Sequence, residues 1–144
     1  MTPRTRRLIA PIAVGAVSLA AIAYVGLVDP NTPGHYPLCP TKALTGLDCP
    51  FCGGLRATHA LAHGDLGSAV DHNALVALVI VPALVVLWAV WLRRAWTGVR
   101  REPSTRAARV QPALLWASVV VLVAFTVLRN IDTVPALAWL GSST

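Results

Sequence analysis

Three long apolar stretches separated by polar segments dominate the pattern of this chain. They cover residues 8–28, 74–92 and 110–128, and none of them contains a charged residue. An α-helix rises about 1.5 Å per residue, so roughly 20 apolar residues cross the ~30 Å hydrocarbon core of a membrane. Lipid offers the backbone no hydrogen-bond partners, which leaves the helix as the structure for such stretches. The pattern therefore predicts an all-α membrane protein with three transmembrane helices.

The polar segments complete the predicted organisation. Prolines at four positions follow the first span, so the connector there cannot be a regular helix. Short helices are expected over residues 41–47, 55–63 and 65–70, the second ended by Gly64 and the third capped by Asp65. The segment is too short for a core of its own, so we expect a short amphipathic helical cap, bearing the cysteines, on the helix ends. The chain is thus divided into a basic start with the first span (1–28), a Cys/His segment (29–73), the second span (74–92), a basic loop (93–109), the third span (110–128) and a tail (129–144).

Further sequence features bear on how the predicted helices begin, bend and pack. Asn73 or Asp71, just before the second span, is expected to cap it. Pro82 lies in the middle of that span, where the missing backbone N–H predicts a kink or a lost hydrogen bond. Small residues at spacings of three and four along the first span predict close contact with another helix. They are Ala13, Ala16, Ala20 and Ala23.

Composition and charge agree with a membrane protein and predict its orientation. Hydrophobic residues make up 56% of the chain and charged residues 12%, about half of what a soluble domain carries. The start and the 93–109 loop hold nine basic residues and one acidic residue, whereas the Cys/His segment and the tail hold three basic and five acidic residues. Because positive charge collects on the cytoplasmic side, the N-terminus is predicted inside and the Cys/His segment outside the cytoplasmic membrane. This distribution explains the net charge of +6, and no nucleic-acid partner is expected.

The sequence Cys49-Pro-Phe-Cys52-Gly is the sharpest chemical motif, and it is compatible with three kinds of site. Two sulfurs at a turn can bind zinc, with Cys39 as a third ligand and His35, His59 or His63 as the fourth. A Cys-x-x-Cys pair at a helix start can cycle between dithiol and disulfide, because the helix N-terminus favours the Cys49 thiolate. Two of the three cysteines can instead form a static disulfide in an oxidising compartment. The residues alone leave these alternatives open.

Other polar residues are expected to shape the structure or an interface rather than to react. They are Gly53 at the turn, Arg56 on the predicted helix, Asp65 and Asn73 as helix caps, and Arg129 with Asn130 at the end of the third span. Arg129 suits a helix C-terminus and is expected to contact lipid headgroups or to reach Asp65 or Asp71. No nucleophile–base pair, phosphate-binding loop, paired carboxylates or hydride-cofactor fingerprint is visible. The sequence therefore indicates no catalytic residue, and zinc is the one cofactor it suggests.

Several of these residues together resemble a known family. The motifs are Cys39-Pro40, Thr45-Gly46-Leu47, Cys49 to Gly53, Arg56-Ala57, Gly64-Asp65, Asn73 and, in the tail, Arg129-Asn130, Pro135 and Trp139-Leu140. Their combination resembles the domain of unknown function 2752, a family of small bacterial membrane proteins, over about residues 39–81 and the tail. This chain departs at Phe51, Leu55 and Ala74, where that family usually has Gly, Thr and Pro, so a less tight bend is expected. The resemblance implies a multi-span membrane protein and supplies no activity.

The sequence as a whole favours a non-catalytic membrane protein that serves as an accessory or assembly partner in the cytoplasmic membrane. Its expected partners are the lipid bilayer and other membrane proteins. The alternative is a thiol–disulfide redox or zinc-binding membrane protein that uses the motif of Cys49 and Cys52.

Overall fold

The described part of the chain folds entirely into helices and their connections. The computed structural model describes residues 2–37, 39–99 and 105–131. The helices in order are α1 (Pro3–Leu27), α2 (Pro40–Thr45), α3 (Gly54–Ala62), α4 (Leu66–Leu75), the π-helix η1 (Val76–Ile80), α5 (Val81–Thr97) and α6 (Thr105–Arg129). Three stretches are long and apolar enough to cross a membrane: Pro3–Leu27, Leu66–Thr97 and Arg109–Arg129. The predicted multi-pass all-α fold, with a cysteine-bearing segment between the first two spans, is confirmed.

The second span is longer than its apolar run because the polar residues before it are already helical. The helices α4, η1 and α5 follow one another without a connector, with a bend at Asn73 (φ −164°, ψ 96°). The Oδ1 atom of Asn73 accepts a hydrogen bond from the N–H of Val76 at 2.9 Å, so the predicted cap at this residue is confirmed. The disturbance expected from Pro82 takes the form of η1, a widened turn that ends two residues before the proline.

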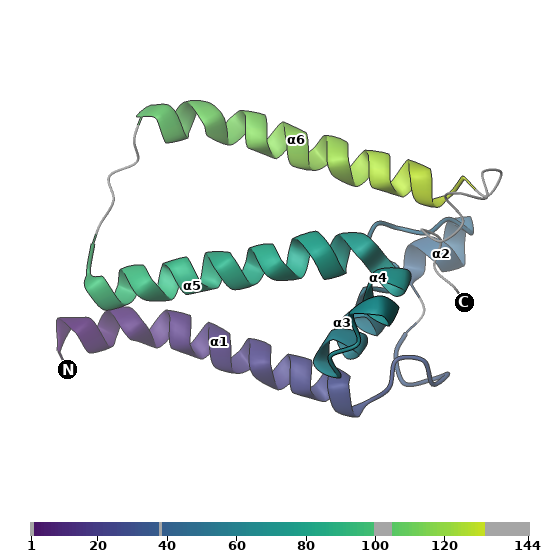
Figure 1. Ribbon diagram of the computed structural model, residues 1–144, viewed down its shortest axis with the longest axis horizontal. Helices are drawn as coiled ribbons and strands as arrows, with labels where there is room; N and C mark the ends of the chain where they lie inside the picture. The colour runs from purple at the N-terminus through teal and green to yellow at the C-terminus, as the bar shows by residue number, and fades with distance from the viewer. Residues whose placement is uncertain (1, 38, 100–104, 132–144) are drawn as a thin grey trace.

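Helices α1 and α5 lie side by side and antiparallel (Figure 1), with a close contact between Gly15 and Trp88. A Cβ atom at Gly15 would lie 2.7 Å from the ring of Trp88, so only glycine leaves room for the indole. The Nε1–H of Trp88 donates to the carbonyl oxygen of Pro11 at 2.9 Å. Pro11 and Gly15 are buried, whereas the four alanines expected to make a helix contact are exposed, so that prediction is wrong. The contact depends on a residue without a Cβ, not on a row of alanines.

Helices α2, α3 and α4 form a cap at one end of the molecule (Figure 1). Small buried side chains, Ala60, Ala69 and Ala77, join α3 to α4 and η1 at short range. His59 of α3 connects the cap to α1, because its Nδ1 atom lies 2.8 Å from the carbonyl oxygen of Val25. The cap is therefore built on the last turn of α1 and the bend of the second span.

Arginines lie at the other end of α1 and α5. The guanidinium of Arg4 lies 3.7 Å from the ring centre of Trp96 in α5, a cation–π contact. Arg7 lies against Gly98, where an added Cβ would come within 2.8 Å of the guanidinium. The basic ends of α1 and α5 and the cysteine-bearing cap are thus at opposite ends of the molecule (Figure 1).

Helix α6 stands apart from α1 and α5 in Figure 1 and makes no extensive contact with another helix of the described part. None of the residues in its most apolar window is buried. Such an apolar exterior is what a helix surrounded by lipid presents. At its end, Arg129 is buried and Asn130 reaches the cap, so this end fastens α6 to the rest of the molecule.

Candidate cysteine site

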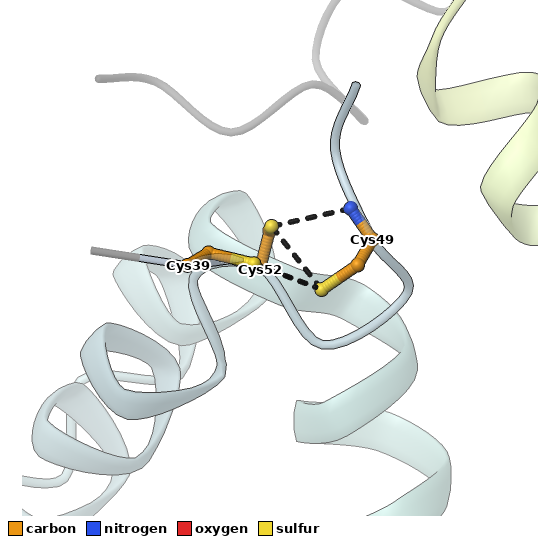
Figure 2. Close-up of side chains that lie close together, drawn as sticks. All are labelled: Cys39, Cys49 and Cys52. Carbon is orange, nitrogen blue, oxygen red and sulfur yellow. Dashed lines mark hydrogen bonds between the residues drawn. The ribbon is translucent and has the colours of Figure 1, made fainter. Parts of the chain in front are cut away.

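Three cysteine side chains from two segments converge in the cap (Figure 2). Cys39 directly precedes α2, and Cys49 and Cys52 lie in the turn before α3. The Sγ atom of Cys49 is 3.5 Å from that of Cys39 and 3.2 Å from that of Cys52. All three sulfur atoms lie within 4.8 Å of one another, and all three residues are free thiols. Cys52 is buried, whereas Cys39 and Cys49 are half-buried, so the cluster has an inner and an outer side.

The turn that carries Cys49 and Cys52 has a tight backbone. The N–H of Cys52 donates to the carbonyl of Cys49 at 3.0 Å, and the N–H of Cys49 donates to the Sγ of Cys52 at 3.2 Å. Gly53 follows with a φ of +76°, a left-handed conformation that glycine adopts readily. A Cβ atom there would lie 2.5 Å from the carbonyl oxygen of His72. Glycine at this position therefore lets the turn approach α4 closely.

Asn73 of α4 fastens this turn from one side. Its Nδ2 atom donates to the carbonyl oxygens of Pro50 at 2.9 Å and Cys52 at 3.0 Å. The side chain is 2% exposed, so these hydrogen bonds are shielded from competing water. One buried amide thus caps the helix after the bend and fixes two carbonyls of the cysteine turn.

The end of α6 fastens the turn from another direction. The Oδ1 atom of Asn130 accepts the N–H of Asp48 and its Nδ2 donates to the carbonyl of Asp48, both at 2.8 Å. The side chain of Arg129 is fully buried; its Nη2 donates to the carbonyl of His72 at 3.2 Å, and its Nε lies 3.7 Å from the Asp48 carboxylate. These contacts join α6 to the residue directly before Cys49.

Three charged side chains meet directly before the cysteine turn, at Asp48. Lys42 lies 3.1 Å from the carboxylate of Asp48, which Arg129 approaches from the buried side. The two cations and one anion together carry a charge of +1. Sequence reasoning did not single out Asp48; its position directly before the first cysteine of the motif was the available signal.

The surroundings also separate the acidities of two of the thiols. The backbone N–H of Lys42 is the main cause that lowers the pKa of Cys39 to about 7. Burial is the main cause that raises the pKa of Cys52 to about 12. The lowered pKa therefore belongs to the cysteine directly before α2.

A comparison with protein families covers this site. Residues 39–88 match the model of the family described as "Protein of unknown function (DUF2752)". This segment belongs to the DUF2752 domain family. The DUF2752 segment contains all three cysteines and Asn73, and it ends inside α5, so the expected resemblance is confirmed. A search of curated proteins and a search of solved structures gave no significant match.

Within the DUF2752 segment, the structure separates the residues considered as zinc ligands. The three cysteines come together, whereas His59 lies elsewhere on α3. The Nδ1 atom of His59 is within hydrogen-bond distance of the carbonyl oxygen of Val25, and its Nε2 lies 3.9 Å from the Asp29 carboxylate. Its ring is 4.4 Å from that of His63. In the described structure His59 therefore joins the cap to α1 and does not face the sulfurs.

The remaining residues singled out from the sequence fall into two groups. Those that contact the cysteine turn or the residue before it are Gly53, Asn73, Arg129 and Asn130. Asp65 lies at the start of α4, and Arg56 lies in the first turn of α3. Asp65 caps α4 by accepting the N–H of Ser68 at 3.0 Å, and hydrogen bonds from Ser68 lower the pKa of Asp65. Arg56 is half-buried on α3. Arg129 contacts Asp48, not the Asp65 or Asp71 considered from the sequence.

Proposed function

We propose that this DUF2752 membrane protein binds one Zn²⁺ ion through the thiolates of Cys39, Cys49 and Cys52. The convergence of a third sulfur, from a separate segment, carries the proposal, since a disulfide requires only two. Zinc–thiolate bonds of about 2.3 Å place tetrahedral sulfur ligands roughly 3.8 Å apart. The observed separations of 3.5 and 3.2 Å would widen by about 0.3 and 0.6 Å to match that spacing.

The charges around the cluster support the same proposal. Zn²⁺ bound by three thiolates carries a net charge of −1. Lys42, Arg129 and Asp48, which meet directly before the cysteine turn, together carry +1, a charge opposite in sign to that of the bound site. Deprotonated thiols are the form that binds zinc, and a positive environment favours them.

The proposed setting is the outer face of the cytoplasmic membrane, where the protein serves as a non-catalytic accessory to other membrane proteins. The basic ends of α1 and α5 would lie in the cytoplasm and the cysteines outside. Impermeant maleimide applied to intact cells, after mild reduction and metal chelation, should then label the cysteines. Labelling that requires opening the membrane would contradict this orientation.

Metal analysis of the purified protein tests the zinc proposal. Protein extracted in mild detergent and kept reduced should contain one zinc per chain, and a chelator should remove it. Cys39→Ser, Cys49→Ser and Cys52→Ser should each weaken zinc binding at least about tenfold, or ~1.4 kcal/mol. His59→Gln is the matched control, because His59 lies outside the sulfur cluster. This variant should bind zinc like the wild type. Wild-type protein with three reduced thiols and no affinity for zinc would overturn the proposal.

A second candidate function is thiol–disulfide exchange, favoured by the position of Cys49 within 3.5 Å of both other sulfurs. The Cys49 thiolate would attack a disulfide of a partner protein, and one partner sulfur would leave as a thiolate. Cys39 or Cys52 would then attack the Cys49 sulfur and release the second partner thiolate. The partner disulfide is reduced to two thiols, and two cysteines of this protein become a disulfide.

Trapping experiments distinguish this second function from zinc binding. The double variant Cys39→Ser/Cys52→Ser lacks both resolving thiols, so an exchange protein should accumulate as a mixed disulfide through Cys49. The matched variant Cys39→Ser/Cys49→Ser keeps only the buried Cys52 and should accumulate less. An absence of mixed disulfides in both variants would contradict thiol–disulfide exchange.

A further inference from the structure

We infer that the zinc ion at this site keeps one coordination position open and that a thiolate from another molecule occupies it. The inference rests on the proposed zinc function and names the class of ligand that the site exchanges. Four ligands complete a structural zinc site, whereas three protein ligands leave a position for water or a second molecule.

The described part of the chain supplies three ligands and no fourth. No histidine, aspartate or glutamate joins the three sulfurs in that part. Asp48 is the carboxylate nearest in sequence, and its oxygens face Lys42 and Arg129. His59 is engaged with the end of α1. A metal at the centre of the sulfurs therefore lacks an internal donor within these residues.

The outer side of the cluster gives an external donor access. Cys52 forms the buried side, and the half-exposed Cys39 and Cys49 form the side that solvent reaches. The three sulfurs lie close together and come from two separate segments of the chain (Figure 2). A donor arriving from the solvent would approach the ion between Cys39 and Cys49, opposite Cys52.

The surrounding contacts keep the site in this three-ligand form. Asn73 fixes the carbonyls of the turn, and Asn130 fixes the backbone of Asp48 before it. Gly53 lets the turn lie so close to the His72 carbonyl of α4 that a residue with a Cβ atom would clash there. Because the turn is fastened on both sides, moving the turn or the Asp48 backbone toward another ligand would break these hydrogen bonds.

A thiolate is the donor class that best fits the open position. Three sulfur ligands make this a soft site, and soft ligands and thiophilic metals select one another. On binding, the thiol of the incoming molecule loses its proton to the buffer, a metal–sulfur bond forms and the bound water leaves. No electron is transferred. The donor is either a small thiol or a cysteine of another protein.

Cobalt substitution measures the number of thiolates directly. Co²⁺ replaces zinc in such sites, and its sulfur-to-cobalt charge-transfer absorption grows with each thiolate bound. Titration of the Co²⁺ protein with N-acetylcysteine should raise this absorption by about a third, as three thiolates become four. N-acetylserine, which has the same shape without the sulfur, should leave it unchanged. Cobalt content is measured after gel filtration, so that extraction of the metal by the thiol is detected.

Two arms of the titration separate the sources of the thiolate. A small soluble protein with one exposed cysteine is compared with N-acetylcysteine at equal thiol concentration. Tighter binding of the protein thiol favours a protein cysteine as the class of donor, and tighter binding of N-acetylcysteine favours a small thiol. Either result supports an open position.

The outcomes distinguish this inference from the zinc proposal beneath it. If the protein binds neither Zn²⁺ nor Co²⁺, the proposed zinc function is itself wrong. Protein that binds Co²⁺ but shows no spectral change with saturating thiol overturns the open position and leaves metal binding intact. Asp132→Asn, at a position outside the described residues, should bind and titrate like the wild type. If the Co²⁺ form of Asp132→Asn lacks a protein ligand that the wild type has, the wild-type site already has four ligands and the inference is overturned.

Discussion

Replacing Gly53 by alanine isolates the close contact between the cysteine turn and α4. Gly53 has a φ of +76°, and an added Cβ would lie 2.5 Å from the carbonyl oxygen of His72. Gly64 is the matched control, because its φ is also +76° and no heavy atom lies within 4 Å of its added Cβ. Both variants place alanine in the left-handed region at a cost of about 1–2 kcal/mol. Only Gly53→Ala also forces two segments apart.

The size of the difference follows from the geometry. The His72 carbonyl would have to retreat from 2.5 Å to the 3.4 Å of ordinary contact. Forcing extra atoms into a packed site costs about 1–3 kcal/mol. The same carbonyl accepts a hydrogen bond from Arg129, so the retreat also disturbs the attachment of α6. We therefore expect losses in unfolding free energy of about 2–5 kcal/mol for Gly53→Ala and about 1–2 kcal/mol for Gly64→Ala.

Thermal unfolding in detergent and competition with a zinc chelator measure the two consequences. The unfolding midpoint should fall further for Gly53→Ala than for Gly64→Ala. Zinc affinity should fall at least about tenfold, or ~1.4 kcal/mol, for Gly53→Ala, because Cys52 moves with the turn. Gly64→Ala should bind zinc like the wild type. Equal losses of stability in the two variants would refute the reasoning. They would mean that the cost of Gly53→Ala comes from the left-handed backbone alone and not from the contact with His72.

Three further predictions concern other contacts. Asn130→Ala removes both hydrogen bonds to Asp48 and should lower the unfolding free energy by about 1–3 kcal/mol and speed proteolysis near the end of α6; unchanged cleavage would contradict this. Trp88→Phe removes the hydrogen bond to α1 and should lower the unfolding midpoint more than Trp91→Phe, whose side chain is 41% exposed; the reverse order would count against the α1–α5 contact. In reduced, zinc-free protein, alkylation of Cys39 by iodoacetamide should rise with pH to half its maximum near pH 7, since its pKa is lowered to about 7 and the thiolate reacts. A midpoint near pH 9 would contradict the lowered pKa.

The membrane helices were predictable because lipid imposes a simple rule on sequence. Uncharged stretches of about 20 residues have few alternatives to a spanning helix, and the three spans followed from them. Local rules also predicted ends and caps, as Asp65 before α4 and Asn73 before Val76 show. These features depend on residues within one turn of each other, so the sequence contains the information in readable form.

The contacts that define the candidate site were harder to predict because they join distant parts of the chain. The cysteines were visible, but nothing in the spacing required Cys39 to meet Cys49 and Cys52. The double hydrogen bond between Asn130 and Asp48 joins residues 82 positions apart. Sequence reasoning placed Arg129 and Asn130 at the end of the third span, predicted over residues 110–128, and still had no means of naming the partner of Asn130. Partners of this kind follow from packing, which one sequence does not reveal.

The proposed zinc site and the attachment of α6 share one piece of backbone, so we expect zinc binding and the docking of α6 to be coupled. Asn130 holds the residue before Cys49, so the conformation that binds zinc is also the one that docks α6. Coupling between two such events is reciprocal: zinc must strengthen docking by the factor by which docking strengthens zinc binding. At zinc concentrations of about 100 times the dissociation constant, a ligand specific for the folded site adds roughly 2.7 kcal/mol of stability. Zinc should therefore slow proteolysis near the end of α6 in the wild type and do so much less in Asn130→Ala. Equal protection of both proteins would show that the metal site and the third span are independent.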